Sequence, residues 1–442
     1  MSELKMINGK TLRMLSTVTF GLTVIFLGFS YFFSDGFFGS ICSADPVCFF
    51  SGINSLPFFL HRILAVVLLA WLVYYLHFIW LYYRTDHLLL NLGTILVVLY
   101  FFQVLLGLAY VFGQPTTTAG PVMHDITAWL ILIDVAGLVV VATKAGEPTL
   151  NHPELDLRER FFDVVMLTKP VIVLLLLFTT LAGMFFGAKS VPPLNLIVLT
   201  LVGGALAAGG SGAINQYLDR DLDREMQRTA KRPLPSGRIY PAEALAIGIA
   251  FCIISLYMFF AFVNLLSAAL TFAGMVYYVY FYSVLLKKAT VQNIVIGGGA
   301  GALPAVIGWA AVTGEISWAS VILFLIVFMW TPPHFWALAI VRQKDYAKVN
   351  IPMLPVIKGE LETRRTILLY SLVLVATTLL LPLFNFAGTI YLLSALVLGA
   401  GFIFLAIRVL VITGNKVAWV LYKYSSYYLF LIFLAVIFDS VF

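Results

Sequence analysis

The chain has 442 residues, of which 62% are apolar and only 11% carry a charge. A soluble globular domain has about 25% charged residues, so these values exclude a soluble enzyme and a disordered protein. Three cysteines are too few for a disulfide-built secreted domain, and the net charge of +6 does not by itself indicate nucleic-acid binding. The apolar residues form blocks and do not alternate, unlike a membrane β-barrel. The composition therefore predicts an all-α polytopic membrane protein.

About 20 apolar residues are needed for a helix to cross a bilayer. Thirteen blocks meet this requirement: 14–34, 61–82, 88–112, 123–143, 164–187, 195–217, 242–262, 266–286, 291–312, 318–340, 366–383, 387–411 and 418–441. If the N-terminus is cytoplasmic, 24 of the 27 lysines and arginines lie on the cytoplasmic side, as the positive-inside rule requires. We therefore predict a multi-pass plasma-membrane protein with a cytoplasmic N-terminus.

The longest polar break lies between the fourth and fifth blocks. It contains two prolines and charges of both signs, which is typical of a linker. We predict a four-helix domain over residues 1–145, a cytoplasmic linker over 146–162 and a nine-helix domain over 163–442.

The cytoplasmic loop after the sixth block reads NQYLDRDLDREMQRTAKRPLPSGR. Asn215, Asp219 and Asp223 are spaced by four, so they share one helix face, whereas Asp221 points away. Oxygen ligands in one stripe suit Mg²⁺. The cations that follow suit the remaining oxygens of a diphosphate; they are Arg224, Arg228, Lys231, Arg232 and Arg238. The alternative is an ordinary positively charged loop with surface charge pairs.

A second loop on the same side offers another carboxylate. Asp345 follows the tenth block and is flanked by Arg342, Lys344 and Lys348. Both loops then run into a Leu-Pro pair, which is weak internal repetition. Two acidic loops on one side of a membrane are placed to hold one metal-diphosphate between them.

Residues 160 to about 410 resemble a known family. Met226, Arg228, Thr229 and Arg232-Pro233-Leu234 follow the aspartates as in the UbiA-type intramembrane prenyltransferases. Further stretches resemble one branch, protoheme IX farnesyltransferase (haem O synthase): LTKP at 167–170, KKATVQNIVIGGGAGALP at 287–304, GW at 308–309, TPPHFW at 331–336, and KDY with IPMLPV within 344–356.

The resemblance implies transfer of a farnesyl group from farnesyl diphosphate to a vinyl group of haem B, with Mg²⁺ assisting and pyrophosphate leaving. By motif match it assigns the Mg-diphosphate to Asn215, Asp219, Asp223 and Asp345, and it gives Arg228, Lys231, Arg232 and Lys169 as diphosphate partners. Related enzymes often carry a further acidic residue beside Asp345, where this chain has Lys344.

Two further features of the nine-helix domain are its aromatic residues, which fit this chemistry, and its glycine run, which does not bear on it. Five aromatic residues within 277–282 can shield a carbocation from water, although helix packing is the alternative. The glycines at 297–299 and 301 lie inside a span and follow no strand. They therefore predict close helix packing instead of a dinucleotide site.

His334 is the main candidate for contact with the haem substrate. An imidazole within a membrane span is costly and therefore a functional candidate, and it stands after Pro332 and Pro333. The alternative is a histidine that hydrogen-bonds to carbonyls freed by these prolines. The resemblance favours contact with haem.

His61 and His124 begin the second and fourth blocks, so the topology puts both at the outer ends of their helices. Two histidines at one depth in a four-helix bundle predict a bis-histidine haem b site. The alternative is two separate interfacial histidines.

Residues 10–145 resemble one half of haem A synthase through His61-Arg62, Ala65, Gln103, Gly107, His124 and Ala128. That family has a glutamate where this chain has Phe58, which weakens the case for haem A synthesis. We expect a haem-binding module, and whether it is also catalytic stays open. The expected partners are haem A synthase or a second copy of the chain. The resemblance also implies a disulfide between Cys42 and Cys48 in the first outer loop, an oxidising location.

Two alternatives to haem O synthesis remain at this stage. One is a prenyltransferase for an aromatic or quinone precursor, which would not need the paired histidines. The other is a haem carrier with a degenerate prenyltransferase half, although the intact Asn215, Asp219, Asp223 and Asp345 oppose it.

Overall fold

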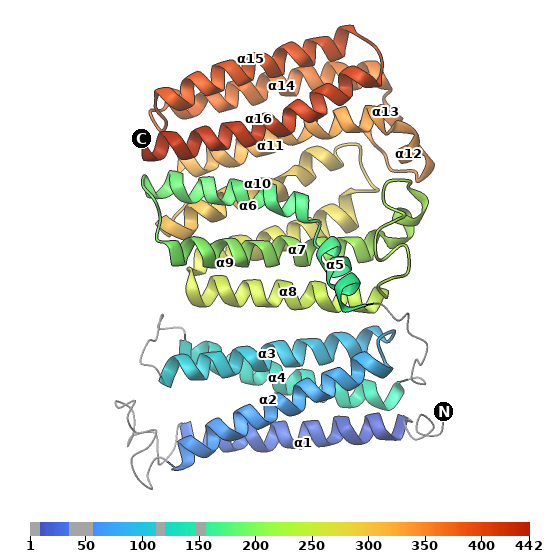
Figure 1. Ribbon diagram of the computed structural model, residues 1–442, viewed down its shortest axis with the longest axis vertical. Helices are drawn as coiled ribbons and strands as arrows, with labels where there is room; N and C mark the ends of the chain where they lie inside the picture. The colour runs from blue at the N-terminus through green and yellow to red at the C-terminus, as the bar shows by residue number, and fades with distance from the viewer. Residues whose placement is uncertain (1–8, 35–55, 112–119, 146–155) are drawn as a thin grey trace. The chain divides into compact units, whose positions relative to one another are not determined.

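The protein is helical throughout the part of the chain that the computed structural model describes, residues 9–34, 56–111, 120–145 and 156–442 (Figure 1). Thirteen helices in these ranges are long and apolar enough to cross a membrane. The predicted all-α polytopic class and the number of spans are therefore confirmed.

Within the described ranges most helices are joined by only a few residues, and the longer loop 226–240 joins α7 to α8. In chain order they are α1 (Gly9–Ser34), α2 (Leu56–Tyr82), α3 (His87–Val111), α4 (Gly120–Lys144), α5 (Leu157–Leu167), α6 (Pro170–Ala188), α7 (Leu194–Glu225), α8 (Pro241–Phe262), α9 (Leu265–Val276), the π-helix η4 (Tyr277–Leu286), α10 (Asn293–Thr313), α11 (Trp318–Val341), α12 (Gln343–Lys348), α13 (Leu354–Ile357), α14 (Glu360–Leu383), α15 (Thr389–Val411) and α16 (Asn415–Val441).

The chain forms two compact units, Met1–Asp156 with Ile239–Ile253, and Leu157–Arg238 with Ile254–Phe442. In the first unit, α1 to α4 form a closed four-helix ring, because each helix packs on the next and α4 packs on α1. The domain and linker boundaries drawn from the sequence remain predictions.

In the second unit α10 is the central helix, packed between α6 and α11 and also against α9 and η4. Helix α11 in turn packs on α14 and α16, and α15 closes against both of these. Figure 1 shows these helices running side by side. The resulting core contains fully buried aromatic side chains such as Phe402, Tyr428 and Phe433.

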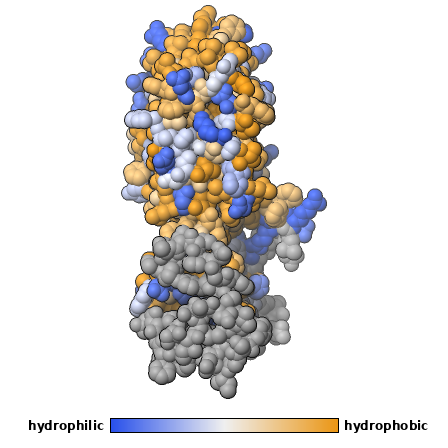
Figure 2. All heavy atoms as spheres, turned by 90° about the vertical axis from the view of Figure 1, so that its left-hand side faces the viewer, coloured by the Kyte–Doolittle hydropathy of each residue, from blue (hydrophilic) through white to orange (hydrophobic). Residues whose placement is uncertain are grey.

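The sides of the helices expose large apolar residues. Val171 is 80% exposed and Val397 is 72% exposed, and Figure 2 shows hydrophobic residues over much of the face that it presents, with hydrophilic ones in scattered patches. In water such a surface would aggregate. In a bilayer it is the expected one, because helices satisfy their own backbone hydrogen bonds and turn apolar side chains to lipid.

The fifth predicted span, 164–187, differs from the structure, because α5 and α6 are separate helices. Pro170 is the first residue of α6, and proline disfavours helical geometry at the residue before it. Lys169 accordingly adopts a left-handed conformation with φ 57° and ψ 60°. The break leaves the Lys169 side chain at the end of the helix and not along its side.

Glycines allow α10 to approach its neighbours closely. A Cβ at Gly308 would lie 1.9 Å from the carbonyl oxygen of Thr180 on α6, and one at Gly183 would lie 2.1 Å from that of Ala305. Within the glycine run, a Cβ at Gly297 would clash with Tyr282 on η4, whereas Gly301 has nothing within 4 Å. The predicted packing role is therefore confirmed for Gly297 but not for Gly301.

Replacing Gly308 with alanine should weaken the α6–α10 contact by about 2 kcal/mol, a typical cost of overpacking. The added methyl would meet backbone, which no rotamer change can move aside. Thermal unfolding of purified protein in detergent would measure the loss. Gly301→Ala is the matched control on the same helix, and an equal effect of the two substitutions would contradict this interpretation.

Candidate active site

The three spaced residues of α7 form a buried stripe. Asn215, Asp219 and Asp223 are 3%, 5% and 5% exposed, whereas the side chain of Asp221 is 73% exposed and pairs with Arg220 and Arg224. The helix continues to Glu225, eight residues past the predicted span end at 217. The expected sharing of one face is therefore confirmed.

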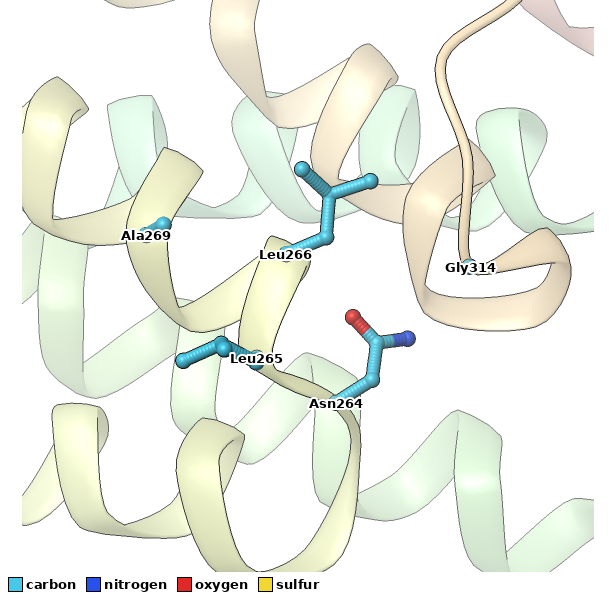
Figure 3. Close-up of a pocket in the computed structure, with 5 residues that line it drawn as sticks. All are labelled: Asn264, Leu265, Leu266, Ala269 and Gly314. Atoms are coloured by element: carbon cyan, nitrogen blue, oxygen red, sulfur yellow. The ribbon is translucent and has the colours of Figure 1, made fainter.

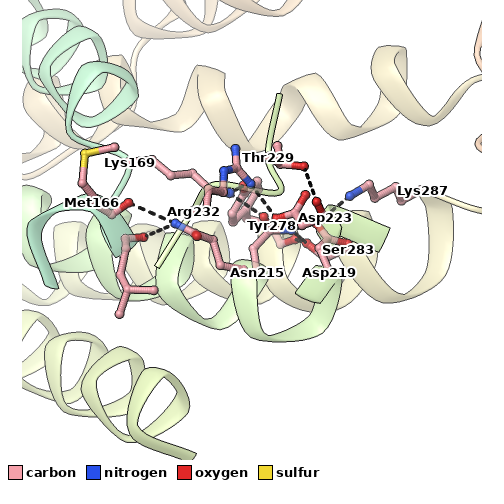
Figure 4. Close-up of polar contacts among 12 residues, drawn as sticks. Met166, Lys169, Asn215, Asp219, Asp223, Thr229, Arg232, Tyr278, Ser283 and Lys287 are labelled. Carbon is pink, nitrogen blue, oxygen red and sulfur yellow. Dashed lines mark hydrogen bonds and ion pairs between the residues drawn. The ribbon is translucent and has the colours of Figure 1, made fainter. Parts of the chain in front are cut away.

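Each aspartate of the stripe is paired with a cation (Figure 4). Lys287 donates to Asp219 Oδ2 at 2.5 Å, and Asn215 Nδ2 donates to the same oxygen at 3.0 Å. Arg232 donates to Asp223 Oδ2 at 2.7 Å. Both aspartates use Oδ2 for these bonds, and Oδ1 of each makes no side-chain hydrogen bond with the described residues.

Lys169 enters the same network from the break between α5 and α6. Its ammonium donates to Asn215 Oδ1 and, at 3.0 Å, to the hydroxyl of Tyr278. Burial, and then the neighbouring Arg232 guanidinium, lowers the pKa of Lys169 to about 8. The amine therefore remains mostly protonated near neutral pH, and it is a cation held out of water beside two carboxylates.

Backbone contacts hold Lys169 in this position. Gln216 donates to the carbonyl oxygens of Met166 and Leu167 at 3.1 and 2.8 Å, which ties the end of α5 to α7. A Cβ at Gly212 would stand only 3.3 Å from the Thr168 carbonyl oxygen. A bare glycine and an amide side chain on α7 thus fix the chain beside Asn215.

The π-helix η4 supplies two further polar groups. Ser283 donates to the Tyr278 carbonyl at 2.8 Å, an i to i−5 bond, and accepts from Asn215 Nδ2 at 2.8 Å. Tyr278 and Tyr282 stack with ring centroids 5.8 Å apart. The wider turn brings both tyrosines and Ser283 to the α7 stripe, and π-turns of this kind are frequent at functional sites.

Asp345 lies on α12, which packs against the end of α7. Tyr346 and Val349 contact Met226 in one buried cluster, and Lys348 donates to the Glu225 carbonyl at 3.0 Å. The nearest cation to Asp345 Oδ2 is Arg342, at 3.8 Å, and this buried oxygen has no hydrogen-bond partner.

Among the described residues, no three histidine, cysteine, aspartate or glutamate side chains gather closely enough to hold a metal ion. Asp345 therefore does not join Asp219 and Asp223 in one cluster. Two of the four candidate diphosphate cations, Lys169 and Arg232, lie in the α7 network, whereas Arg228 and Lys231 are exposed on the turns after α7.

Sequence reasoning missed four residues of this network: Gln216, Tyr278, Ser283 and Lys287. Lys287 and Gln216 stand inside or beside stretches that carry the family resemblance. The sequence therefore marks both positions, but it does not indicate what either side chain does. Tyr278 was seen only as one aromatic among several. Nothing in the spacing pointed to Ser283, which reaches Asn215 from 68 residues away.

His334 is buried at 8% exposure on α11. Its ring stacks on Trp330 at 4.3 Å and lies 4.6 Å from the Tyr422 ring. Its Nδ1 is 2.6 Å from the Ser425 hydroxyl of α16. The bond of Nδ1 is therefore made to another helix and not to a carbonyl freed by the prolines.

In the first unit, His61 of α2 and His124 of α4 are both partly buried. Gln103 Nε2 lies 3.2 Å from Nδ1 and 3.1 Å from Nε2 of His124, and Phe26 stacks on His61 with centroids 5.0 Å apart. His61 Nδ1 is buried without a hydrogen-bond partner. Cys42 and Cys48 lie outside the described residues.

A hollow of about 460 Å³ lies between the start of α9 and the end of α10. Asn264, Leu265 and Gly314 line it (Figure 3). The Asn264 amide is already bonded to the Ala310 carbonyl and to the Ser267 backbone amide. The hollow lies at the other end of α9 and η4 from Lys287, so it is separate from the α7 network.

The model of the UbiA prenyltransferase family matches residues 176–435. This range includes the α7 stripe, η4 and both acidic loops. The chain belongs to the UbiA prenyltransferase family.

Several relatives of this chain share one name. Proteins called "Protoheme IX farnesyltransferase" are 49% identical over 279 residues in Roseiflexus sp., 48% over 279 in Symbiobacterium thermophilum and 50% over 283 in Trichodesmium erythraeum. Each match covers 63% of this chain. The chain spans 52% of the Roseiflexus relative, but 93% of the Symbiobacterium one and 86% of the Trichodesmium one.

A solved structure of digeranylgeranylglyceryl phosphate synthase is similar with a TM-score of 0.55 and 19% sequence identity. The similarity covers 64% of this chain and 99% of that one. At this identity the likeness concerns the fold alone.

Lys287→Met should destabilise this family member by about 3 kcal/mol, because it leaves the Asp219 carboxylate buried without its cation. Thermal or denaturant unfolding in detergent would measure the loss. Lys288→Met, which removes the exposed neighbouring lysine, is the control. The double variant Lys287→Met with Asp219→Asn should recover part of the loss, and additive effects would contradict the pairing.

Proposed function

We propose that the chain is a protoheme IX farnesyltransferase, which transfers a farnesyl group from farnesyl diphosphate to a vinyl group of haem B and so makes haem O. The observation that carries the proposal is the relative of that name in Symbiobacterium thermophilum, matched at 48% identity over 93% of its length. The paired carboxylates and cations of the α7 stripe support it.

The donor set suits Mg²⁺ and a diphosphate. Oδ1 of Asp219, Oδ1 of Asp223 and the second lone pair of Asn215 Oδ1 are hard oxygen ligands on one helix face. The unpartnered Asp345 oxygen, on a helix packed against the end of α7, suits a second contact with the ion–diphosphate pair. Mg²⁺ held by these groups would neutralise charge that develops on the leaving diphosphate.

The charge balance of the network supports the same ligands. Lys169, Arg232 and Lys287 face Asp219 and Asp223, so the buried cluster has one cation more than it has carboxylates. Adding a divalent ion and a trianionic diphosphate brings the sum to zero. A net charge of zero is favoured in a buried site, because an uncompensated buried charge is costly.

The reaction breaks the bond between farnesyl C1 and its oxygen, and the electron pair leaves with the diphosphate. The cations of the network stabilise that charge. The stacked Tyr278 and Tyr282 rings beside the stripe would shield the allylic cation from water. The vinyl π pair of haem then bonds to C1, and the new cation takes the oxygen of a water molecule, which releases one proton.

The active-site loops and the N-terminus are cytoplasmic in this proposal, and the protein resides in the plasma membrane. The positive-inside distribution of 24 of the 27 basic residues supports that orientation. The α7 network then meets farnesyl diphosphate at the inner membrane surface, with the prenyl chain in contact with lipid.

We further propose that the four-helix domain binds haem b between His61 and His124. The partly buried positions of both histidines, the unpartnered Nδ1 of His61 and the contact of Gln103 with His124 support this. If the Gln103 amide turns so that Oε1, which has no hydrogen-bond partner, faces the ring, it would accept the N–H of a haem-bound His124. The domain acts in haem delivery, either to haem A synthase or within a dimer of this chain.

Expression in a host that lacks haem O synthase, followed by extraction of its haems, tests the farnesyltransferase activity. The wild-type chain should produce haem O, and Asp219→Asn should reduce it at least 100-fold because diphosphate binding is lost. Asp221→Asn, on the exposed side of the same helix, should keep near-normal activity. Absence of haem O from cells whose membranes contain the wild-type protein would overturn the proposal.

The haem site of the four-helix domain is tested by absorption spectra of the purified protein. His61→Ala should remove the bis-histidine haem signal while Asp219→Asn retains it, because the two sites are separate. His77→Ala, at an exposed position on the same helix, is the matched control. An unchanged spectrum in His61→Ala would show that the haem site is wrong.

A further inference from the structure

The hydroxyl of Ser425 determines which nitrogen of His334 carries the proton. Ser425 Oγ donates its single hydrogen to the Tyr422 carbonyl at 2.7 Å. His334 Nδ1 lies 2.6 Å from the same oxygen, and Ser425 keeps its bond to the Tyr422 carbonyl only if it accepts from this nitrogen. The neutral ring that satisfies both contacts carries its proton on Nδ1, which leaves the lone pair on Nε2.

Three aromatic rings and one hydroxyl surround the His334 ring, the third ring being Phe335 at 5.3 Å, and within the described part of the chain none of them hydrogen-bonds to Nε2. Trp330 covers one face at 4.3 Å, and Tyr422 lies 4.6 Å from the ring centroid at an angle of 31°. The Nδ1 edge is taken by Ser425. Trp330 Nε1 also donates to the Ser425 carbonyl at 2.6 Å, so the Trp330 ring and Ser425 are held against each other.

A buried cluster links this part of α11 with the end of α7. Phe335, whose ring meets the His334 ring edge-on at 5.3 Å, packs against the cluster that contains Tyr346 of α12 and Met226, the residue after α7. His334 therefore lies beside a cluster that reaches the end of the α7 stripe.

We propose that Ser425 is a positioning residue that holds His334 in the Nδ1–H form, so that Nε2 presents its lone pair to the iron of the haem substrate. The inference rests on the proposed function, because it takes haem as the acceptor. Histidines that bind metals usually donate their other ring N–H to an oxygen acceptor, which fixes the tautomer and the ring orientation. The Ser425 hydroxyl is such an acceptor.

The test uses the full chain with His61→Ala and His124→Ala, which removes the haem site proposed for the four-helix domain. This parent protein is purified in detergent and titrated with ferric haem B while absorption spectra are recorded. It should give a histidine-ligated spectrum. Adding His334→Gly should abolish that spectrum, and free imidazole should restore it.

Ser425→Ala removes the acceptor for Nδ1–H. It keeps the backbone carbonyl that accepts from Trp330 Nε1, so the Trp330 ring stays against His334. It should weaken haem affinity 10- to 100-fold, the usual range for such outer partners, and alter the spectrum. Ser425→Thr, which keeps the hydroxyl, should remain within about 3-fold of the parent. Ser426→Ala is the matched control, since Ser426 bonds the same Tyr422 carbonyl at 3.4 Å without touching His334.

The outcomes separate this inference from the proposed function. If His334→Gly or Ser425→Ala leaves the spectrum and the affinity of the parent unchanged, the inference is wrong, whether or not the chain makes haem O. If both change them as expected while the wild-type chain makes no haem O, ligation stands and the proposed activity fails. Loss of haem O in His334→Gly with an unchanged haem spectrum also contradicts ligation.

Discussion

Two carboxylates buried at the end of a membrane helix have to be paired with cations, and the second unit of the protein is arranged around this requirement. Asp219 and Asp223 are each 5% exposed, and an unpaired charge so placed would cost several kcal/mol. The compensating cations come from different segments: Lys287 follows η4, and Arg232 lies in the loop after α7. Pairing with the two carboxylates therefore holds the end of η4 and the loop after α7 against the stripe.

The same requirement explains why the helices around the site are irregular. A regular helix through residues 164–187 would have kept Lys169 along the side of a span. The break before Pro170 instead puts its ammonium against Asn215. The π-turn of η4 has a comparable effect, because it brings Ser283 within 2.8 Å of the Asn215 amide. Both irregularities lie at a point of contact with the α7 stripe.

Most of the fold could be predicted from the sequence because bilayer thickness imposes a minimum helix length. The α7 stripe could be predicted because four-residue spacing is local. The partners of the stripe could not, since Ser283 and Lys287 are 68 residues from theirs and depend on how helices pack. For the same reason, Pro332 and Pro333 suggested local carbonyl partners for His334, whereas its bond to Ser425 spans 91 residues.

Lys169 has two roles that no other common residue can fill together. Its backbone is left-handed, a conformation that costs most side chains about 1 kcal/mol and that glycine and asparagine adopt more readily. Its side chain must also be a long cation, which neither of those residues provides. A substitution that relaxes the backbone therefore removes the charge, and arginine keeps the charge but presents a wider group to Asn215 and Tyr278. The local conformational cost persists at this position because relieving it would give up the cation that the site uses.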